Sequence, residues 1–310
     1  MIVNFVGNYQ NGYVGEQADE VHLTREIEAL GHTVRRLPRD EWREHVLDGK
    51  PYRNIPEDLK ADINIFCKWH HFYDGRFIKE LKKRSGAPVF YWVWDYMFDQ
   101  GFPDWHWENV LACDLYLAND GAHGGYKDKY YYFPFDVCDG DIPVPLFSGN
   151  DIEVLFTGTY LGQGDRIDFM KKINEVHPIT VYSWNHTEWE KNGFAAHPAQ
   201  YGSAYNAIVS KSLVTLGFSV NPHSCGYWSN RVGKVIRAGG CLLQQYAPGM
   251  ELMIGDLADY FSSPEEACEK IQKYKDNPQL SNEMKGKGWL HGRRFTSQTR
   301  VGQLMILCER

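Results

Sequence analysis

The stretch 152–176, IEVLFTGTYLGQGDRIDFMKKINEV, passes from an apolar run through a glycine-bearing loop into a segment with helical periodicity. We predict a strand over residues 152–156 and a helix over residues 165–176, joined by a loop that holds Gly158, Gly162 and Gly164. A strand, a glycine loop and a helix in this order are typical of a parallel α/β unit. The sequence therefore predicts the α/β fold class.

The start of the chain has the same order of elements. A strand is predicted over residues 2–6, a glycine-rich loop over 7–15, a helix over 18–30 that Gly31 ends, and a strand over 33–37. Further apolar runs predict strands at 62–67, 88–94, 113–118 and 130–133, with a helix at 77–84. The first half of the chain is therefore a second α/β unit.

The two units are separated by residues 135–150, FDVCDGDIPVPLFSGN, where periodicity stops and prolines, aspartates and glycines accumulate. Beyond residue 176 we predict strands at 179–183, 212–219 and 241–245, and helices at 230–238 and 264–277. We therefore expect two domains, 1–147 and 148–310, with the last helix a candidate to cross back to the first. A cleft between two such domains is the expected ligand site.

The composition excludes several classes of protein. The net charge of −7 argues against a protein that binds nucleic acid without regard to sequence. Seven scattered cysteines without a C-x-x-C pattern predict neither a disulfide framework nor a zinc ribbon. No apolar run is long enough to span a membrane, so we expect a soluble protein of the reducing cytoplasm. No metal site is predicted, because the nearest cluster, Cys67-x-x-His70-His71, lacks a second pair of ligands.

The glycine loops do not carry a known nucleotide fingerprint. Neither loop has the spacing G-x-G-x-x-G, and the chain contains no G-x-x-x-x-G-K-[ST] motif. Both loops can still present backbone N–H groups to an anion or a sugar.

A basic helix is predicted in the stretch 228–240, WSNRVGKVIRAGG, with Ser229 as its N-cap and two glycines at its end. Arg231 and Lys234 are three residues apart and share one face of this helix. A guanidinium, an ammonium and the helix start suit a diphosphate. The alternative is a packed helix with an ordinary solvated basic face.

Residues 229–249, S-N-R-V-G-K-V-I-R-A-G-G-C-L-L-x-x-Y-x-P-G, resemble the donor-binding segment of group 1 glycosyltransferases with the GT-B fold, most closely the spore-maturation-protein-like branch. The resemblance continues through residues 259–266, and residues 154–159 resemble the strand and loop that open the second domain of that family. About half of the chain is covered. The resemblance implies two Rossmann-like domains that face a cleft, with a nucleotide-sugar bound by the second.

The resemblance also implies roles for single residues. It places the diphosphate on Arg231 and on the loop at Gly158 and Thr159, with Ser229 at the helix start. The family often carries two acids with seven residues between them, and the corresponding positions here are Gly226 and Lys234. A lysine cannot accept hydrogen bonds from ribose hydroxyls, but it can pair with phosphate, so we expect Lys234 to contact the donor.

Other residues are also candidates for the site. Tyr227 and Trp228 are candidates to line the nucleotide pocket or, equally, to be core residues. In the first domain, we expect the loop at Gly12 to approach the donor. Asp95 follows a buried strand, and we favour it as a sugar or acceptor contact or an acid–base group, with a helix cap as the alternative. His22 is a second catalytic candidate, although a lone histidine is more often structural.

These observations predict a nucleotide-sugar-dependent glycosyltransferase that needs no metal or other cofactor. We expect a UDP-sugar as the donor, and the resemblance implies retention of the anomeric configuration. The acceptor stays open among a glycan, a protein, a small molecule and a modified base in DNA. The alternatives are a DNA glycosyltransferase acting on a hydroxymethylated pyrimidine, a sugar-nucleotide epimerase, and a catalytically degenerate sugar-nucleotide-binding protein.

Overall fold

The computed structural model describes residues 1–7, 9, 19–38, 58–67, 75–94, 104–119, 128–134, 149–162, 165–220 and 222–309, without the side chains of Trp105 and Asp165. The chain divides into two compact units. Unit 1 comprises Met1–Phe135 and Ser297–Arg310, and unit 2 comprises Asp136–Thr296. Most of the predicted linker, residues 135–148, lies outside the described residues.

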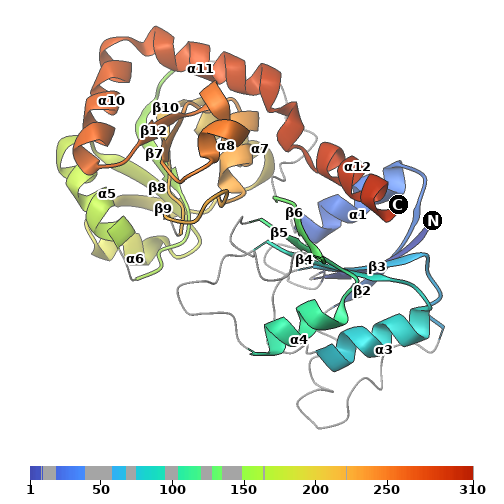
Figure 1. Ribbon diagram of the computed structural model, residues 1–310. Helices are drawn as coiled ribbons and strands as arrows, with labels where there is room; N and C mark the ends of the chain where they lie inside the picture. Colours follow the sequence, from blue (N-terminus) through green and yellow to red (C-terminus); the bar gives the residue numbers. More distant parts are fainter. Residues whose placement is uncertain are drawn as a thin grey trace. The chain divides into compact units, whose positions relative to one another are not determined.

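Unit 1 contains a parallel sheet of six strands in the order β2-β1-β3-β4-β5-β6. Helices α1 and α12 lie on one face of this sheet, and α3 and α4 lie on the other (Figure 1). The strands are β1 Ile2–Gly7, β2 Thr33–Pro38, β3 Ile63–Cys67, β4 Val89–Val93, β5 Leu115–Ala118 and β6 Tyr130–Tyr132. The helices are α1 Asp19–Ala29, α3 Gly75–Ser85, α4 Asp104–Ala112 and α12 Ser297–Cys308.

The central strands of unit 1 are buried along their whole length. Every residue of β3 and of β4 is buried. Helices on both faces exclude water from the sheet, which is why these strands are apolar runs and show no alternation. The predicted strands of this half are confirmed, whereas α4 was not predicted.

Unit 2 contains a second parallel sheet of six strands, in the order β12-β11-β10-β7-β8-β9. The strands are β7 Ile152–Thr157, β8 Ile179–Ser183, β9 Ala195–Pro198, β10 Ser212–Gly217, β11 Leu242–Gln245 and β12 Asp259–Phe261. The helices are α5 Asp165–Val176, α6 His186–Lys191, α7 Gly202–Ser210, α8 Arg231–Arg237, α9 Met250–Met253, α10 Pro264–Asp276 and α11 Pro278–His291, with 3-10 turns at Gly255–Leu257 and Gly292–Phe295.

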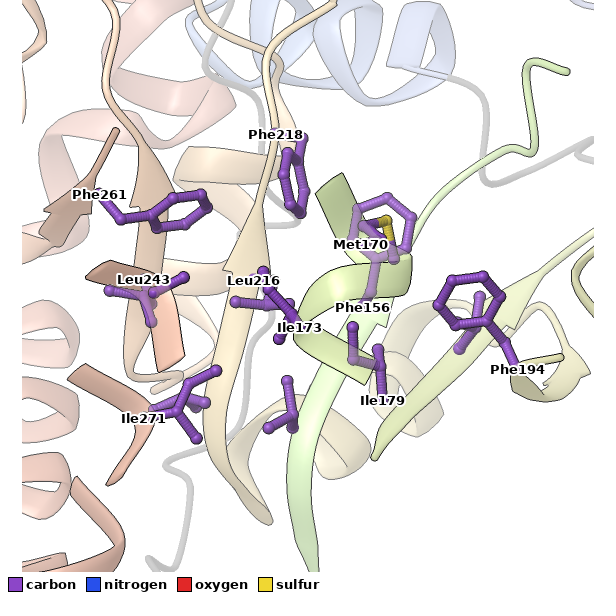
Figure 2. Packing of buried hydrophobic residues seen from close by; sticks show 14 of the residues in the cluster. Phe156, Met170, Ile173, Ile179, Phe194, Leu216, Phe218, Leu243, Phe261 and Ile271 are labelled. Carbon is purple, nitrogen blue, oxygen red and sulfur yellow. The ribbon is translucent and has the colours of Figure 1, made fainter. Parts of the chain in front are cut away.

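The core of unit 2 lies where side chains of the sheet meet α5 and α10 (Figure 2). Alternate residues of each strand point to this layer, as the two-residue period of a strand requires. Removal of these side chains from water is the main stabilising contribution to the unit. The cluster includes Phe156, Met170, Ile173, Ile179, Leu216, Phe218, Leu243, Phe261 and Ile271.

The topology of unit 2 predicts where a ligand binds. The chain leaves β7 toward β8 and β9, and then returns to the other side of β7 to form β10, β11 and β12. The strand order therefore reverses between β7 and β10. In open parallel sheets, ligands bind at the carboxyl ends of the strands beside such a reversal.

The structure corrects the sequence-based assignment of several elements. Strands β9 and β12 were not predicted, because each is a short edge strand with exposed or half-exposed residues. Helix α11 was missed because its two glycines, at 286 and 288, weaken the helical pattern. Helices α6 and α7 were also missed. Helix α8 begins at Arg231, one residue later than predicted.

Candidate functional site

A pocket lies in unit 2 at the carboxyl ends of β7, β8 and β9, beside the start of α8. This is the position that the strand order predicts. Two cations, Arg231 and Lys234, line the pocket, and no aspartate or glutamate is among its described lining residues. Its walls are formed by Thr157, Gly158, Thr159, Tyr182, Ser183, Trp184, Ala199, Gln200, Tyr205, Asn230, Arg231 and Lys234.

Arg231, the first residue of α8, is held at the end of β7. Its guanidinium carbon lies 5.1 Å from the centre of the Phe156 ring, and its Nη1 donates to the carbonyl of Phe218 at 3.4 Å. A Cβ on Gly158 would lie 2.6 Å from Nη2 of Arg231, so the glycine allows this approach. Burial lowers the pKa of Arg231, and the guanidinium has no carboxylate partner among the described residues. A buried, unbalanced cation favours the binding of an anion.

A second arginine that the sequence analysis did not single out reinforces this site. Arg166, in the first turn of α5, lies over the same Phe156 ring at 5.7 Å, and its Nη2 donates to the carbonyl of Thr159 at 2.6 Å. Burial, with a smaller contribution from Arg231, lowers the pKa of Arg166 to about 10. Two like charges therefore face one region, where an anion would relieve their repulsion.

Three side chains and one backbone hydrogen bond fix the loop after β7. The amide of Asn185 donates to the carbonyl of Tyr160 at 3.0 Å and accepts from its N–H at 3.0 Å. Trp189 donates to the carbonyl of Gly158 at 3.2 Å, and Trp184 donates to Oγ1 of Thr159 at 3.0 Å. The N–H of Gly158 donates to Tyr182 within the sheet. Of the amides of residues 158–160, only that of Thr159 has no partner among the described residues, so it is the one of these three that can donate to a ligand.

The other donor-site candidates of this region differ in their surroundings. Lys234 lines the pocket one helical turn beyond Arg231. Ser229 lies beside the pocket, and its Oγ accepts from the N–H of Arg231 at 3.3 Å, but the N-cap position of α8 is Asn230. Tyr227 is only 5% exposed and Trp228 2%, and neither lines the pocket. Both are core residues in this structure.

The aromatic residues that do line the pocket are Tyr182, Trp184 and Tyr205. Two of them lie at or just after the carboxyl end of β8, a strand that the sequence analysis placed correctly. The position of a residue at the carboxyl end of a parallel strand is the signal that could have found them.

The structure also explains why residue 226 is a glycine. Its φ angle is 73°, in the left-handed region that a side chain disfavours, and its N–H donates to the carbonyl of Pro248 at 2.8 Å. A glutamate at this position would be strained. The backbone conformation at position 226 therefore favours glycine over the acid that the family often has there.

The remaining candidates lie elsewhere or outside the described residues. His22 lies half-buried on α1 of unit 1. Asp95, Gly12, His70 and His71 are outside the described residues. In the part of the chain that is described, no group of three or more His, Cys, Asp and Glu residues is placed to hold a metal ion.

Residues 166–306 match the family described as glycosyl transferase-like. This part of the chain is similar to that family. The match covers most of unit 2 and extends into α12. The spore-maturation-protein-like branch stays a prediction. By sequence, the chain matches no curated protein.

Solved structures show the same fold over the whole chain. The protein HepE of Anabaena, in complex with UDP and glucose, has a TM-score of 0.67 and 12% identity, with 100% of this chain and 99% of the other covered. Sucrose-phosphate synthase of Thermosynechococcus elongatus has a TM-score of 0.64 and 10% identity over 100% and 98% of the two chains. A DNA-modifying β-glucosyltransferase has a TM-score of 0.63 and 13% identity over the whole of both chains. The predicted GT-B fold, with two Rossmann-like domains, is confirmed.

The match to this family therefore lies within a chain that has the fold of solved glycosyltransferases. Among the described residues, no helix is long and apolar enough to cross a membrane.

Proposed function

We propose that the protein is a glycosyltransferase that moves a sugar from a nucleotide-sugar, most simply a UDP-sugar, to an acceptor. The observation that carries this proposal is the Arg231 guanidinium, held against Gly158 in a pocket whose described lining includes no carboxylate. Lys234 in the same pocket adds a second cation for a diphosphate. The choice of uridine is supported by HepE, which was solved with UDP and glucose and with UDP-glucose.

The reaction breaks the bond between the anomeric carbon of the sugar and the diphosphate oxygen, which keeps the electron pair. The nucleophilic atom of the acceptor forms a new bond to that carbon, and its proton passes to a base or to the departing phosphate. Arg231 and Lys234 would stabilise the charge that develops on the leaving diphosphate, which is the role a metal ion has in other enzymes. We propose metal-independent transfer on this ground.

The other parts of the proposal rest on the sequence. Retention of the anomeric configuration rests on the resemblance to group 1 glycosyltransferases. Asp95 and His22 are the proposed contacts of the first domain with the sugar or the acceptor. The acceptor itself is open, and the net charge of −7 argues against a DNA acceptor.

The test is thermal unfolding in the presence of a panel of nucleoside diphosphates and nucleotide-sugars. A ligand that binds the folded state raises the melting temperature by mass action, so no acceptor is needed. We expect UDP and one or more UDP-sugars to raise it, and Arg231→Ala to abolish the shift. The control is Arg84→Ala, which removes an arginine paired with Glu80 on α3 of unit 1. No shift with any member of the panel would overturn the proposal.

Turnover separates a transferase from a binding protein. We expect slow release of UDP from the stabilising UDP-sugar when water is the acceptor. Binding without any release, across a panel of candidate acceptors, would favour the degenerate binding protein.

A further inference from the structure

Trp184 has a large, solvent-exposed aromatic side chain in the same pocket as Arg231 and Lys234. It follows β8 directly, is 60% exposed and lines the pocket. Its indole Nε1 donates to Oγ1 of Thr159 at 3.0 Å. Exposure of an indole to water is unfavourable, and the hydrogen bond restricts its rotation. The ring is therefore held ready to receive a flat ligand.

The pocket is lined by two chemically different groups of residues, cations and aromatic rings. Arg231 and Lys234 come from α8, whereas Tyr182 and Trp184 come from the end of β8. The ring of Tyr182 is itself supported by His197, with the ring centres 5.0 Å apart. A ligand that fills such a pocket combines an anionic part with a planar apolar part, as a nucleoside diphosphate does.

We propose that Trp184 is the side chain on which the nucleobase of the donor stacks. This inference rests on the proposed function, because it takes the diphosphate to lie on Arg231 and Lys234. Stacking of a base on an aromatic side chain is strong and tolerates any base, since every base has a π-face. Trp184 would thus supply affinity for the nucleotide, and the choice among bases would come from hydrogen-bonding groups.

Thr159 contacts both the stacking candidate and an arginine. Its hydroxyl accepts from Trp184, and its carbonyl accepts from Arg166 at 2.6 Å. The same residue therefore positions the stacking ring and one of the two arginines over Phe156. Thr159→Val keeps the shape of the side chain but removes the acceptor that orients the indole, so it tests Thr159 as a positioning residue for Trp184.

The experiment is isothermal titration calorimetry with UDP and, separately, with inorganic pyrophosphate. We expect Trp184→Ala to weaken binding of UDP by about ten- to a hundredfold and to leave binding of pyrophosphate unchanged. Trp184→Phe, which keeps an aromatic face, should recover part of the loss, and Thr159→Val should weaken UDP binding less than Trp184→Ala. The control is Tyr131→Ala, which removes a 46% exposed aromatic ring from β6 of unit 1 and should change neither affinity.

The outcomes separate this inference from the proposed function. Unchanged UDP binding in Trp184→Ala would overturn the inference and leave the proposed function standing. Equal losses for UDP and pyrophosphate would also overturn it, because Trp184 would then only support the phosphate loop. Failure of the unmodified protein to bind either ligand would overturn the proposed function itself.

Discussion

Gly158 and the guanidinium of Arg231 are in direct contact at the end of β7. A Cβ on Gly158 would lie 2.6 Å from Nη2 of Arg231 and 2.9 Å from Cζ of Phe156. The φ angle of Gly158 is not in the left-handed region, so space and not backbone conformation requires the glycine here. The close approach places a cation where the loop, the sheet and α8 meet.

The first prediction is that Gly158→Ala weakens binding of UDP. The added methyl group must displace the guanidinium, which is the flexible end of a side chain, while the Phe156 ring is fixed in the core. We expect a loss of UDP affinity of roughly tenfold, and a decrease of about 1–3 kcal/mol in the free energy of unfolding from overpacking. Calorimetric titration and urea unfolding measure the two effects.

The matched control for this change is Gly286→Ala. Gly286 lies in α11, and a Cβ there would meet nothing within 4 Å. Alanine should raise the stability slightly because it favours the helix, and should leave UDP binding unchanged. UDP binding by Gly158→Ala at the affinity of the unmodified protein would show that Arg231 does not bind the diphosphate from the position seen here.

The fold could be predicted from the sequence wherever the local pattern and the burial agree. Strands that are buried on both faces, such as β3 and β4, are apolar runs, and α5 and β8 have the predicted bounds. The edge strands β9 and β12 could not be predicted, because a strand of three or four residues with a single buried side chain carries no periodicity. Their pairing is set by the neighbouring strand and not by their own composition.

Residues of the site could be predicted only where a single continuous segment of the sequence contained the motif that indicated them. Arg231, Lys234 and Gly158 were found from the basic helix and the glycine loop, and the structure brings them to one pocket. Arg166 and Trp184 were missed because their roles depend on contacts with a loop that is distant in sequence. For Tyr227 the sequence left the nucleotide pocket and the core equally open, and in the structure this side chain is buried.

The second prediction concerns the role of Lys234. If this lysine pairs with the diphosphate, Lys234→Glu should weaken binding of UDP and of pyrophosphate by roughly tenfold or more, and Lys234→Gln should weaken it less. If the position contacts ribose, as in the related family, the glutamate should instead preserve or improve UDP binding. Titrations with both ligands at two salt concentrations distinguish the cases, because charge effects weaken with salt.

The control for charge reversal is Lys211→Glu. Lys211 directly precedes β10, so it lies at the amino end of that strand and not at the carboxyl end where the pocket is. Its Nζ is 3.7 Å from Asp151. A similar loss of UDP affinity in Lys211→Glu and Lys234→Glu would mean that overall charge, and not contact with the ligand, controls binding.

The third prediction is a pH dependence of stability that arises from Lys285 on α11. This lysine is fully buried, and its Nζ donates to Oδ1 of Asn150 and to the carbonyl of Ser210, both at 3.0 Å. Burial lowers the pKa of Lys285 to about 8. In the unfolded chain the pKa returns to about 10.4, so between these values the unfolded state binds more protons. The contribution of Lys285 to the free energy of unfolding must therefore rise with pH from about 8 to about 10.4.

The size of this pH effect follows from the difference between the folded and unfolded pKa of Lys285. The contribution should increase by at most about 3 kcal/mol across the window and should be flat below pH 8. Other groups also titrate in this range, so their effect must be subtracted. The measured quantity is therefore the difference in unfolding free energy between the unmodified protein and Lys285→Met. Urea unfolding from pH 7 to 10.5 gives this difference. Lys273→Met, which removes an exposed lysine of α10, should show no such difference. A difference for Lys285→Met that does not change with pH would mean that Lys285 stays protonated in the fold, held by its two carbonyl acceptors.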